Sequence, residues 1–149
     1  MKYNHKLAMF LTCLTIFTFR ANATMVPEFE FHEGTQATQS TVCNLVVLPG
    51  DVVTINFKKD DYDCDNDEAK SLTLRDVPEG TVIKIYDDPK LSSDDDYLVI
   101  TVNEDIFDSY IIGNFEQSYI DETVNVYYSE DNGLNGKVSS VRIVVPEAN

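Results

Sequence analysis

The sequence predicts an all-β protein with the architecture of an antiparallel Greek-key β-sandwich, and three observations support this. Short segments rich in β-branched and aromatic residues recur at intervals of roughly 8 to 15 residues, as strands of a sandwich do. Clusters of Pro, Gly, Asp and Asn separate these segments and are typical of turns. No segment keeps apolar residues at helical spacing over three turns.

The strand pattern can be followed along the chain from residue 52. Residues 82–86 alternate about Lys84, whereas residues 98–102 are nearly all apolar. The predicted strands are residues 52–57, 72–74, 82–86, 98–102, 110–112, 124–128 and 138–145. Turn signals lie at residues 49–51, 78–80, 87–89 and 131–133. Residues 105–109 allow one helical turn at most.

The first 23 residues have the pattern of a secretory signal peptide. Two lysines precede an apolar run over residues 7–19, and an Ala-Asn-Ala triplet provides the small residues before a cleavage point at Thr24. The run is shorter than the ~20 apolar residues of a membrane-spanning helix. We therefore expect a secreted or periplasmic chain without an integral membrane segment after cleavage. A retained N-terminal anchor is the alternative.

The chain is strongly acidic. It has 11 Lys plus Arg against 26 Asp plus Glu, a formal net charge of −15. The predicted signal peptide contains three of the basic residues and no acidic one, so the 126 residues that follow carry a formal charge of −18. This charge excludes nucleic acid as a general partner, because phosphate binding needs a basic surface. It is compatible with a cation or with a basic protein as partner.

The length suggests one folded domain after the signal peptide. We expect residues 24–42 to form an N-terminal arm or a first strand, and residues 43–149 to form a single β-sandwich domain. Cys43 and Cys64 are the cysteines that remain after cleavage, and an oxidising compartment favours a disulfide between them. The enclosed loop of about 20 residues predicts ~3 kcal/mol of stabilisation. Two unpaired thiols are the alternative.

The chain contains an internal repeat at an offset of 69 residues. Residues 66–71 align with residues 135–140, so that one Asn/Asp-rich turn falls on another, and the segments that follow both turns read as strands. The alignment extends back, without a gap, to residues 55–57 on residues 124–126. Few aligned positions are identical, so a chance match is the alternative.

With one departure each, both turns follow the form Asn/Asp, Asn/Asp, two free residues, Ser/Thr, Ser, followed by an apolar strand. This pattern resembles the calcium-loop signature of microbial βγ-crystallin domains, more closely at residues 135–140 than at residues 66–71. Residues 82–89 also resemble the opening of such a motif, although the family's aromatic corner is missing after Tyr86. The resemblance covers about residues 43–146 and implies two Greek-key motifs packed as a two-sheet sandwich.

The resemblance also implies a set of calcium ligands. Calcium takes six to eight oxygen atoms from carboxylates, amides, hydroxyls, carbonyls and water. Each loop departs from the pattern once, because Gly136 stands in place of an acid and Lys70 stands where a hydroxyl belongs. Weak calcium binding, or none, is therefore expected. The candidate metal ligands are Asn66, Asp67, Ser71, Asn135 and Ser139.

The acidic residues gather in two stretches. Residues 60–68 have Asp at alternate positions, but they lack the Gly and the bidentate Glu of an EF-hand loop. The second stretch is interpreted as a surface for a cation or for a basic protein, with a solvated loop as the alternative. It consists of Asp87, Asp88, Asp94, Asp95 and Asp96. Phe115 and Tyr119 are predicted to lie in an exposed interaction loop.

Catalysis has little support in the sequence. His32 is the one histidine after the predicted cleavage point, and it falls in the predicted arm. We find no His-bearing metal motif and no Gly-rich phosphate loop in the sequence. The sequence therefore predicts a non-enzymatic, secreted or periplasmic βγ-crystallin-like module that binds calcium weakly. The alternative is an acidic recognition protein, such as an inhibitor, an immunity-type protein or an adhesin, that docks a basic protein.

Overall fold

The computed structural model describes residues 25–59 and 61–148, so the predicted signal peptide lies outside the described residues. Within these ranges, no helix is long and apolar enough to cross a membrane. The loops contain the short 3-10 helices η1 (Thr35–Ala37), η2 (Phe57–Lys59) and η3 (Asp61–Asp63). The strands are β1 (Glu28–His32), β2 (Thr41–Val46), β3 (Val52–Asn56), β4 (Ser71–Val77), β5 (Val82–Tyr86), β6 (Tyr97–Val102), β7 (Ile106–Ile112), β8 (Tyr119–Ile120), β9 (Val124–Ser129) and β10 (Ser140–Val144).

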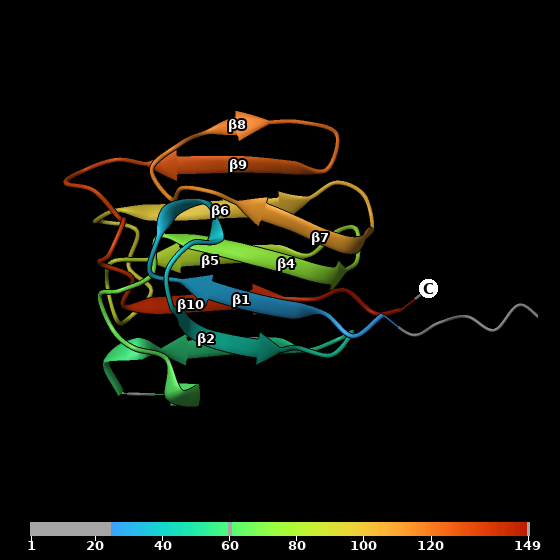
Figure 1. Ribbon diagram of the computed structural model, residues 1–149, viewed down its shortest axis with the longest axis horizontal. Helices are drawn as coiled ribbons and strands as arrows, with labels where there is room; N and C mark the ends of the chain where they lie inside the picture. Colours follow the sequence, from blue (N-terminus) through green and yellow to red (C-terminus); the bar gives the residue numbers. More distant parts are fainter. Residues whose placement is uncertain (1–24, 60, 149) are drawn as a thin grey trace, which may run out of the picture.

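The strands form two antiparallel sheets that lie one over the other (Figure 1). The four-stranded sheet has the order β2-β1-β4-β7, and the six-stranded sheet has the order β3-β10-β5-β6-β9-β8. The predicted all-β antiparallel sandwich is therefore confirmed.

The two halves of the chain contribute strands to the sheets in the same way. β1 pairs with β2 on one side and with β4 on the other in the four-stranded sheet, while β3 crosses over and pairs with β10. β5, β6 and β10 pair in the six-stranded sheet, while β7 crosses over and pairs with β4. The β8–β9 hairpin extends the second sheet beyond β6. The third strand of each set of four thus lies in the sheet of the other set.

The core lies between the sheets, and side chains reach it from alternate positions of the strands. On β6, for example, Leu98 and Ile100 are fully buried, while the residues between them are half-buried on the outer face. Aromatic rings fill the end of the core near η2. The ring of Phe31 meets Phe57 edge-on at 5.6 Å and Phe115 at 6.5 Å between centroids.

Residues 24–42, predicted as an N-terminal arm or a first strand, contain strand β1. β1 lies between β2 and β4, and the predicted domain boundary at Cys43 falls inside β2. His32 is buried on β1, with its Nε2 2.9 Å from the Thr73 hydroxyl. Residues 105–109 belong mostly to strand β7, not to a helical turn. The Glu-Phe alternation at residues 28–31 has the period of a strand and was the available signal for β1.

The predicted disulfide is present. Cys43 on β2 is bonded to Cys64, which follows η3, and their Cα atoms lie 4.9 Å apart. Both residues are buried, and Cys64 has no exposed surface. The bond therefore anchors the acidic β3–β4 loop to the edge of the four-stranded sheet.

Candidate functional site

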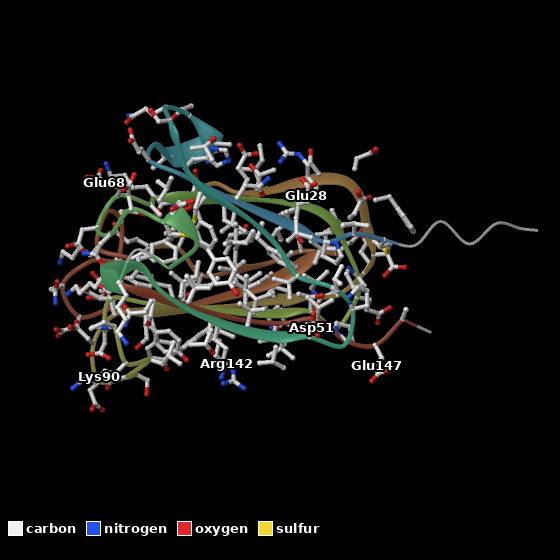
Figure 2. All side chains as sticks on the ribbon, turned by 90° about the horizontal axis from the view of Figure 1, so that it is seen from below. Glu28, Asp51, Glu68, Lys90, Arg142 and Glu147 are labelled. Carbon is white, nitrogen blue, oxygen red and sulfur yellow. A yellow bond between two sulfur atoms is a disulfide. The ribbon has the colours of Figure 1, made fainter. Side chains whose placement is uncertain are left out.

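The candidate site is the end of the sandwich at which the acidic loops gather, seen on the left in Figure 1. The loops that follow β3, β5 and β9 all lie there, and backbone hydrogen bonds connect them. Figure 2 shows Glu68 and Lys90, from two of these loops, at the same end of the molecule. We call this region the loop end.

The two repeated turns are hydrogen-bonded to each other. The N–H of Asp67 donates to the carbonyl of Val138 at 3.2 Å, and the N–H of Gly136 donates to the carbonyl of Ala69 at 2.9 Å. Residues 67 and 136, like residues 69 and 138, are related by the offset of 69. The two bonds are therefore the same contact made once from each half of the chain.

The hydroxyls that end the two turns make equivalent contacts, each within its own half of the chain. Ser71 donates to the carbonyl of Gly34 at 2.5 Å, and Ser140 donates to the carbonyl of Asp88 at 2.6 Å. Both serines are buried at the first position of a strand, β4 or β10. The repeat therefore holds for the turns and for the strands that follow them.

The earlier part of the aligned region does not match in the structure. Residues 55 and 56 end the edge strand β3, which pairs with β10. Residues 124–126 belong to β9, which lies between β6 and β8. The strand that occupies the place of β3 in the second half is β7. The inserted β8–β9 hairpin explains why a single offset cannot align the whole of both halves.

Two candidate ligands meet where the paired turns touch, and a third directly precedes one of them in the chain. Asp67 has a backbone φ of +62°, and its carboxylate oxygen lies 3.5 Å from the hydroxyl of Ser139. Ser139 is fully buried, and its other hydroxyl contact, to the carbonyl of Lys137, is also long at 3.4 Å. The side-chain oxygen of Asn66 is buried and has no hydrogen-bond partner among the described residues. Oxygen atoms from both halves of the chain therefore converge here.

The other two predicted ligands are engaged with the protein itself. The Asn135 side chain accepts a hydrogen bond from the N–H of Phe115 at 3.1 Å and donates to Asn114 at 2.9 Å. Asn135 thereby anchors the loop between β7 and β8. The Ser71 hydroxyl, besides donating to a carbonyl, accepts a hydrogen bond from the N–H of Ala37 at 3.0 Å.

The two departures from the calcium-loop pattern touch each other. Gly136 has a φ of +75°, and a Cβ atom at this position would lie 3.1 Å from Cε of Lys70. A side chain at position 136 would therefore meet both an unfavourable backbone conformation and the Lys70 chain. The lysine of the first turn thus packs over the glycine of the second.

Asp96 holds the loop between β9 and β10. Its buried carboxylate accepts hydrogen bonds from the Tyr128 hydroxyl at 2.6 Å and from the N–H groups of Asp131 and Asn132 at 2.9 and 2.8 Å. Burial opposes ionisation, but these hydrogen bonds and that of Gly133 outweigh it and lower the pKa of Asp96 to about 2. The prediction that Asp96 belongs to an interaction surface is wrong, because the residue has no exposed surface.

The other aspartates in the loop of residues 87–96 have different surroundings. Carboxylate oxygens of Asp87, Asp95 and Asp96 lie within 4.8 Å of one another. Burial raises the pKa of Asp87, and the neighbouring charge of Asp95 adds to the increase. The Asp88 carboxylate accepts hydrogen bonds from the N–H groups of residues 90 and 92 and so shapes its own loop. Asp94 is exposed.

The predicted interaction loop after Gly113 is not an exposed loop at its aromatic residues. Phe115 is fully buried in the core against Phe31. Tyr119 is half-buried on β8 and packs against the core. The prediction for Phe115 is wrong because the Asn135 contact turns this segment inward, and no local signal in the sequence indicates that contact.

The comparisons can now be set beside this geometry. Searches against protein-family models, curated proteins and solved structures found no match. Function is therefore argued from the site alone. No motif in the sequence marks Tyr128, although its hydroxyl donates a hydrogen bond to Asp96 and thereby helps to hold the loop end.

Proposed function

We propose that this chain is a secreted or periplasmic, non-enzymatic βγ-crystallin-like module that binds a divalent cation weakly at the loop end. The observation that carries the proposal is the reciprocal contact between the two turns, in which Asp67 and Gly136 make equivalent hydrogen bonds to the opposite turn. A contact of this kind is expected where two copies of one motif pack around an approximate twofold axis.

The strand order supports the family part of the proposal. In each half the fourth strand returns to pair with the first, as β4 pairs with β1 and β10 pairs with β5. A fourth strand that lies beside the first is the hallmark of a Greek-key motif. The resemblance of residues 66–71 and 135–140 to calcium loops falls at the same place in both halves, directly before that fourth strand.

The cation part is supported by the oxygen atoms that converge between the turns. Asp67 supplies a carboxylate, Ser139 supplies a hydroxyl with two long hydrogen-bond contacts, and Asn66 supplies an amide oxygen without a partner among the described residues. Oxygen donors of these kinds suit calcium. Three side-chain oxygens are fewer than calcium needs, and Lys70 adds a positive charge, so the affinity is in the millimolar range.

A calcium titration read by thermal unfolding tests the proposal. With a Kd of about 1 mM, 10 mM calcium stabilises the native state by about 1.4 kcal/mol, which raises Tm by about 5 °C for a domain of this size. Asp67→Asn removes the carboxylate and should abolish the increase. Asp108→Asn removes an exposed carboxylate from β7 and should leave the increase unchanged.

Two results would contradict the proposal. If calcium raises Tm no more than the same concentration of magnesium, the chain has no calcium site of this kind. If the increase survives Asp67→Asn but disappears with Asp87→Asn, the cation binds among the clustered carboxylates and not between the turns.

A second candidate function is an acidic recognition protein that docks a basic protein. It is favoured by the free carboxylates of the loop end, since the ion pairs formed among the described residues all involve Glu30, on the four-stranded sheet. Binding of a basic partner through Asp94 and Asp95 should weaken steeply between low and high salt. Capture that is unaffected by salt, or by replacing both residues with Asn, would argue against this function.

A further inference from the structure

A shallow groove of about 410 Å³ lies on the outer face of the six-stranded sheet, and Ser93 of the β5–β6 loop lines it at one end. It crosses β5, β6 and β9, and its lining includes Lys84, Tyr86, Tyr97, Thr101, Asn125 and Tyr127. The register places Arg142, Lys84, Val99 and Tyr127 in one row across four neighbouring strands. Apart from Ser93, the lining residues therefore lie on strands, which hold their side chains in fixed relative positions.

Three tyrosine rings form one side of the groove. The rings of Tyr86 and Tyr97 are stacked, with centroids 6.1 Å apart and planes 27° apart. Tyr127 lies 6.1 Å from Tyr97 at an angle of 54° and is 53% exposed. Such rings present an apolar face and a polar hydroxyl at the same place. They suit a ligand that is itself flat and apolar on one face and rich in hydroxyls at its edges, which describes a sugar ring.

Two basic side chains lie directly opposite each other beside these rings. Lys84 on β5 pairs with Arg142 on β10, and like charges at paired positions of a sheet destabilise it. Neither forms an ion pair with a described residue, although the chain has 26 acidic residues. Figure 2 shows Arg142 projecting from the sandwich into solvent. An unfavourable pair of free cations on an otherwise acidic protein indicates an anionic ligand.

The acidic loop end reaches the groove at Ser93, which the exposed Asp94 follows, whereas Lys84 lies further along β5. Asp87 follows Lys84 by three residues, which on an extended strand is about 10 Å, and this is about one Debye length at physiological salt. Arg142 is close enough to Tyr86 that its charge partly offsets the rise in the Tyr86 pKa caused by burial. The ladder places Arg142 diagonally across from Tyr86, because Arg142 pairs with Lys84 and Ser140 pairs with Tyr86.

We propose that this groove binds a saccharide chain that carries spaced acidic groups. One sugar ring lies on Tyr97 and Tyr127, and its carboxylate or sulfate lies between Lys84 and Arg142. Thr101 and Asn125 face the same groove and supply hydrogen bonds to hydroxyls of the sugar. A saccharide with one acid in every second unit fits better than a continuous polyanion, because the groove has one pair of cations and acidic loops at its end.

Titration calorimetry on the full mature chain tests this proposal. The probe is a hyaluronan hexasaccharide, in which every second unit is a uronate, and the neutral comparison is a chitin hexasaccharide of the same length. We expect hyaluronan to bind at least about tenfold more tightly than chitin, as is typical of charge-assisted hydrogen bonds. Hexaglutamate, an acidic peptide without sugar rings, should bind at least about tenfold more weakly than hyaluronan.

Variants separate the contribution of the two cations from that of the tyrosine rings. Lys84→Gln and Arg142→Gln should each weaken hyaluronan binding about tenfold and leave chitin binding unchanged. Tyr127→Ala, and Tyr127→Leu, which keeps an apolar side chain, should weaken the binding of both saccharides. Lys58→Gln and Tyr62→Ala alter exposed residues outside the groove and should change neither.

Several outcomes would overturn the proposal. Equal binding of hyaluronan and chitin would show that the cations do not select the ligand. Binding of hexaglutamate as tight as that of hyaluronan would favour an acidic peptide as the partner. No binding of any probe at millimolar concentration, or binding unaffected by Lys84→Gln and Arg142→Gln in variants with normal unfolding curves, would show that the groove is not the site.

Discussion

Replacing Asp96 by Asn should destabilise the protein in a way that depends on pH. The carboxylate is buried and accepts hydrogen bonds from Tyr128 and from consecutive N–H groups of the β9–β10 loop. An Asn side chain has almost the same shape, but its NH₂ group would face one of these donors and leave a buried N–H without a partner.

The magnitude follows from the pKa. The folded-state pKa of Asp96 is about 2, against 3.8 for an unperturbed group, so the ionised form is the one that the native state favours. A difference of this size contributes about 2 kcal/mol to stability above pH 4, and the contribution is lost as the pH falls through 2. At pH 2.5 less than about 1 kcal/mol remains.

Urea unfolding at pH 6 and at pH 2.5 measures this contribution. The difference in unfolding free energy between wild type and Asp96→Asn should exceed about 2 kcal/mol at pH 6 and shrink by more than about 1 kcal/mol at pH 2.5. Asp94→Asn makes the same charge change at an exposed residue of the same loop and should stay within about 0.5 kcal/mol of wild type. If the two variants behave alike, or if the difference does not change with pH, the role assigned to Asp96 is wrong.

Three further predictions concern the fold. Phe115→Ala should destabilise the protein by about 3–5 kcal/mol in urea unfolding, because the ring is fully buried. A change below about 1 kcal/mol would show that the Phe115 ring is not in the core. Replacing Cys43 and Cys64 together by Ala should cost about 3 kcal/mol, and a transition at the same urea concentration as wild type would show that the bond adds nothing. Gly136→Ala should cost about 1 kcal/mol through its positive φ and the contact with Lys70, and combining it with Lys70→Ala should restore part of that loss; additive losses would mean that the two positions do not interact.

The strands could largely be predicted from the sequence because their signals are local. Residues 82–86 coincide with β5, and the other predicted strands overlap β3, β4, β6, β7, β9 and β10. The turn at residues 49–51 lies between β2 and β3, where its Pro and Gly indicate it. Residues 24–42 were left open as an arm or a first strand because the Glu-Phe alternation of β1 lies among polar residues. Pairing with β2 and β4 makes β1 a central strand.

The candidate site could be predicted only in part, because some of its contacts join residues that are far apart in the chain. The repeat indicated which turns are equivalent, but the reciprocal hydrogen bonds of Asp67 and Gly136 join residues that are 71 and 67 positions apart in the chain. Ser71 and Ser139 looked alike as ligands. The structure shows that they differ. The Ser71 hydroxyl makes two short hydrogen bonds to the backbone, whereas the Ser139 hydroxyl makes only long contacts, to the Asp67 carboxylate and the Lys137 carbonyl.

Local sequence was enough to establish the class of fold, the main strands and turns, the disulfide partners and the acidity of the loops, since periodicity, turn chemistry and charge are properties of neighbouring residues. Strand order, the inward turn of Phe115, the burial of Asp96 beside exposed Asp94 and the pairing of Lys84 with Arg142 were decided by the tertiary structure. Each of these depends on which distant segments meet when the two sheets close on a shared core, and burial and hydrogen bonding across that closure are not encoded in any short stretch of the chain.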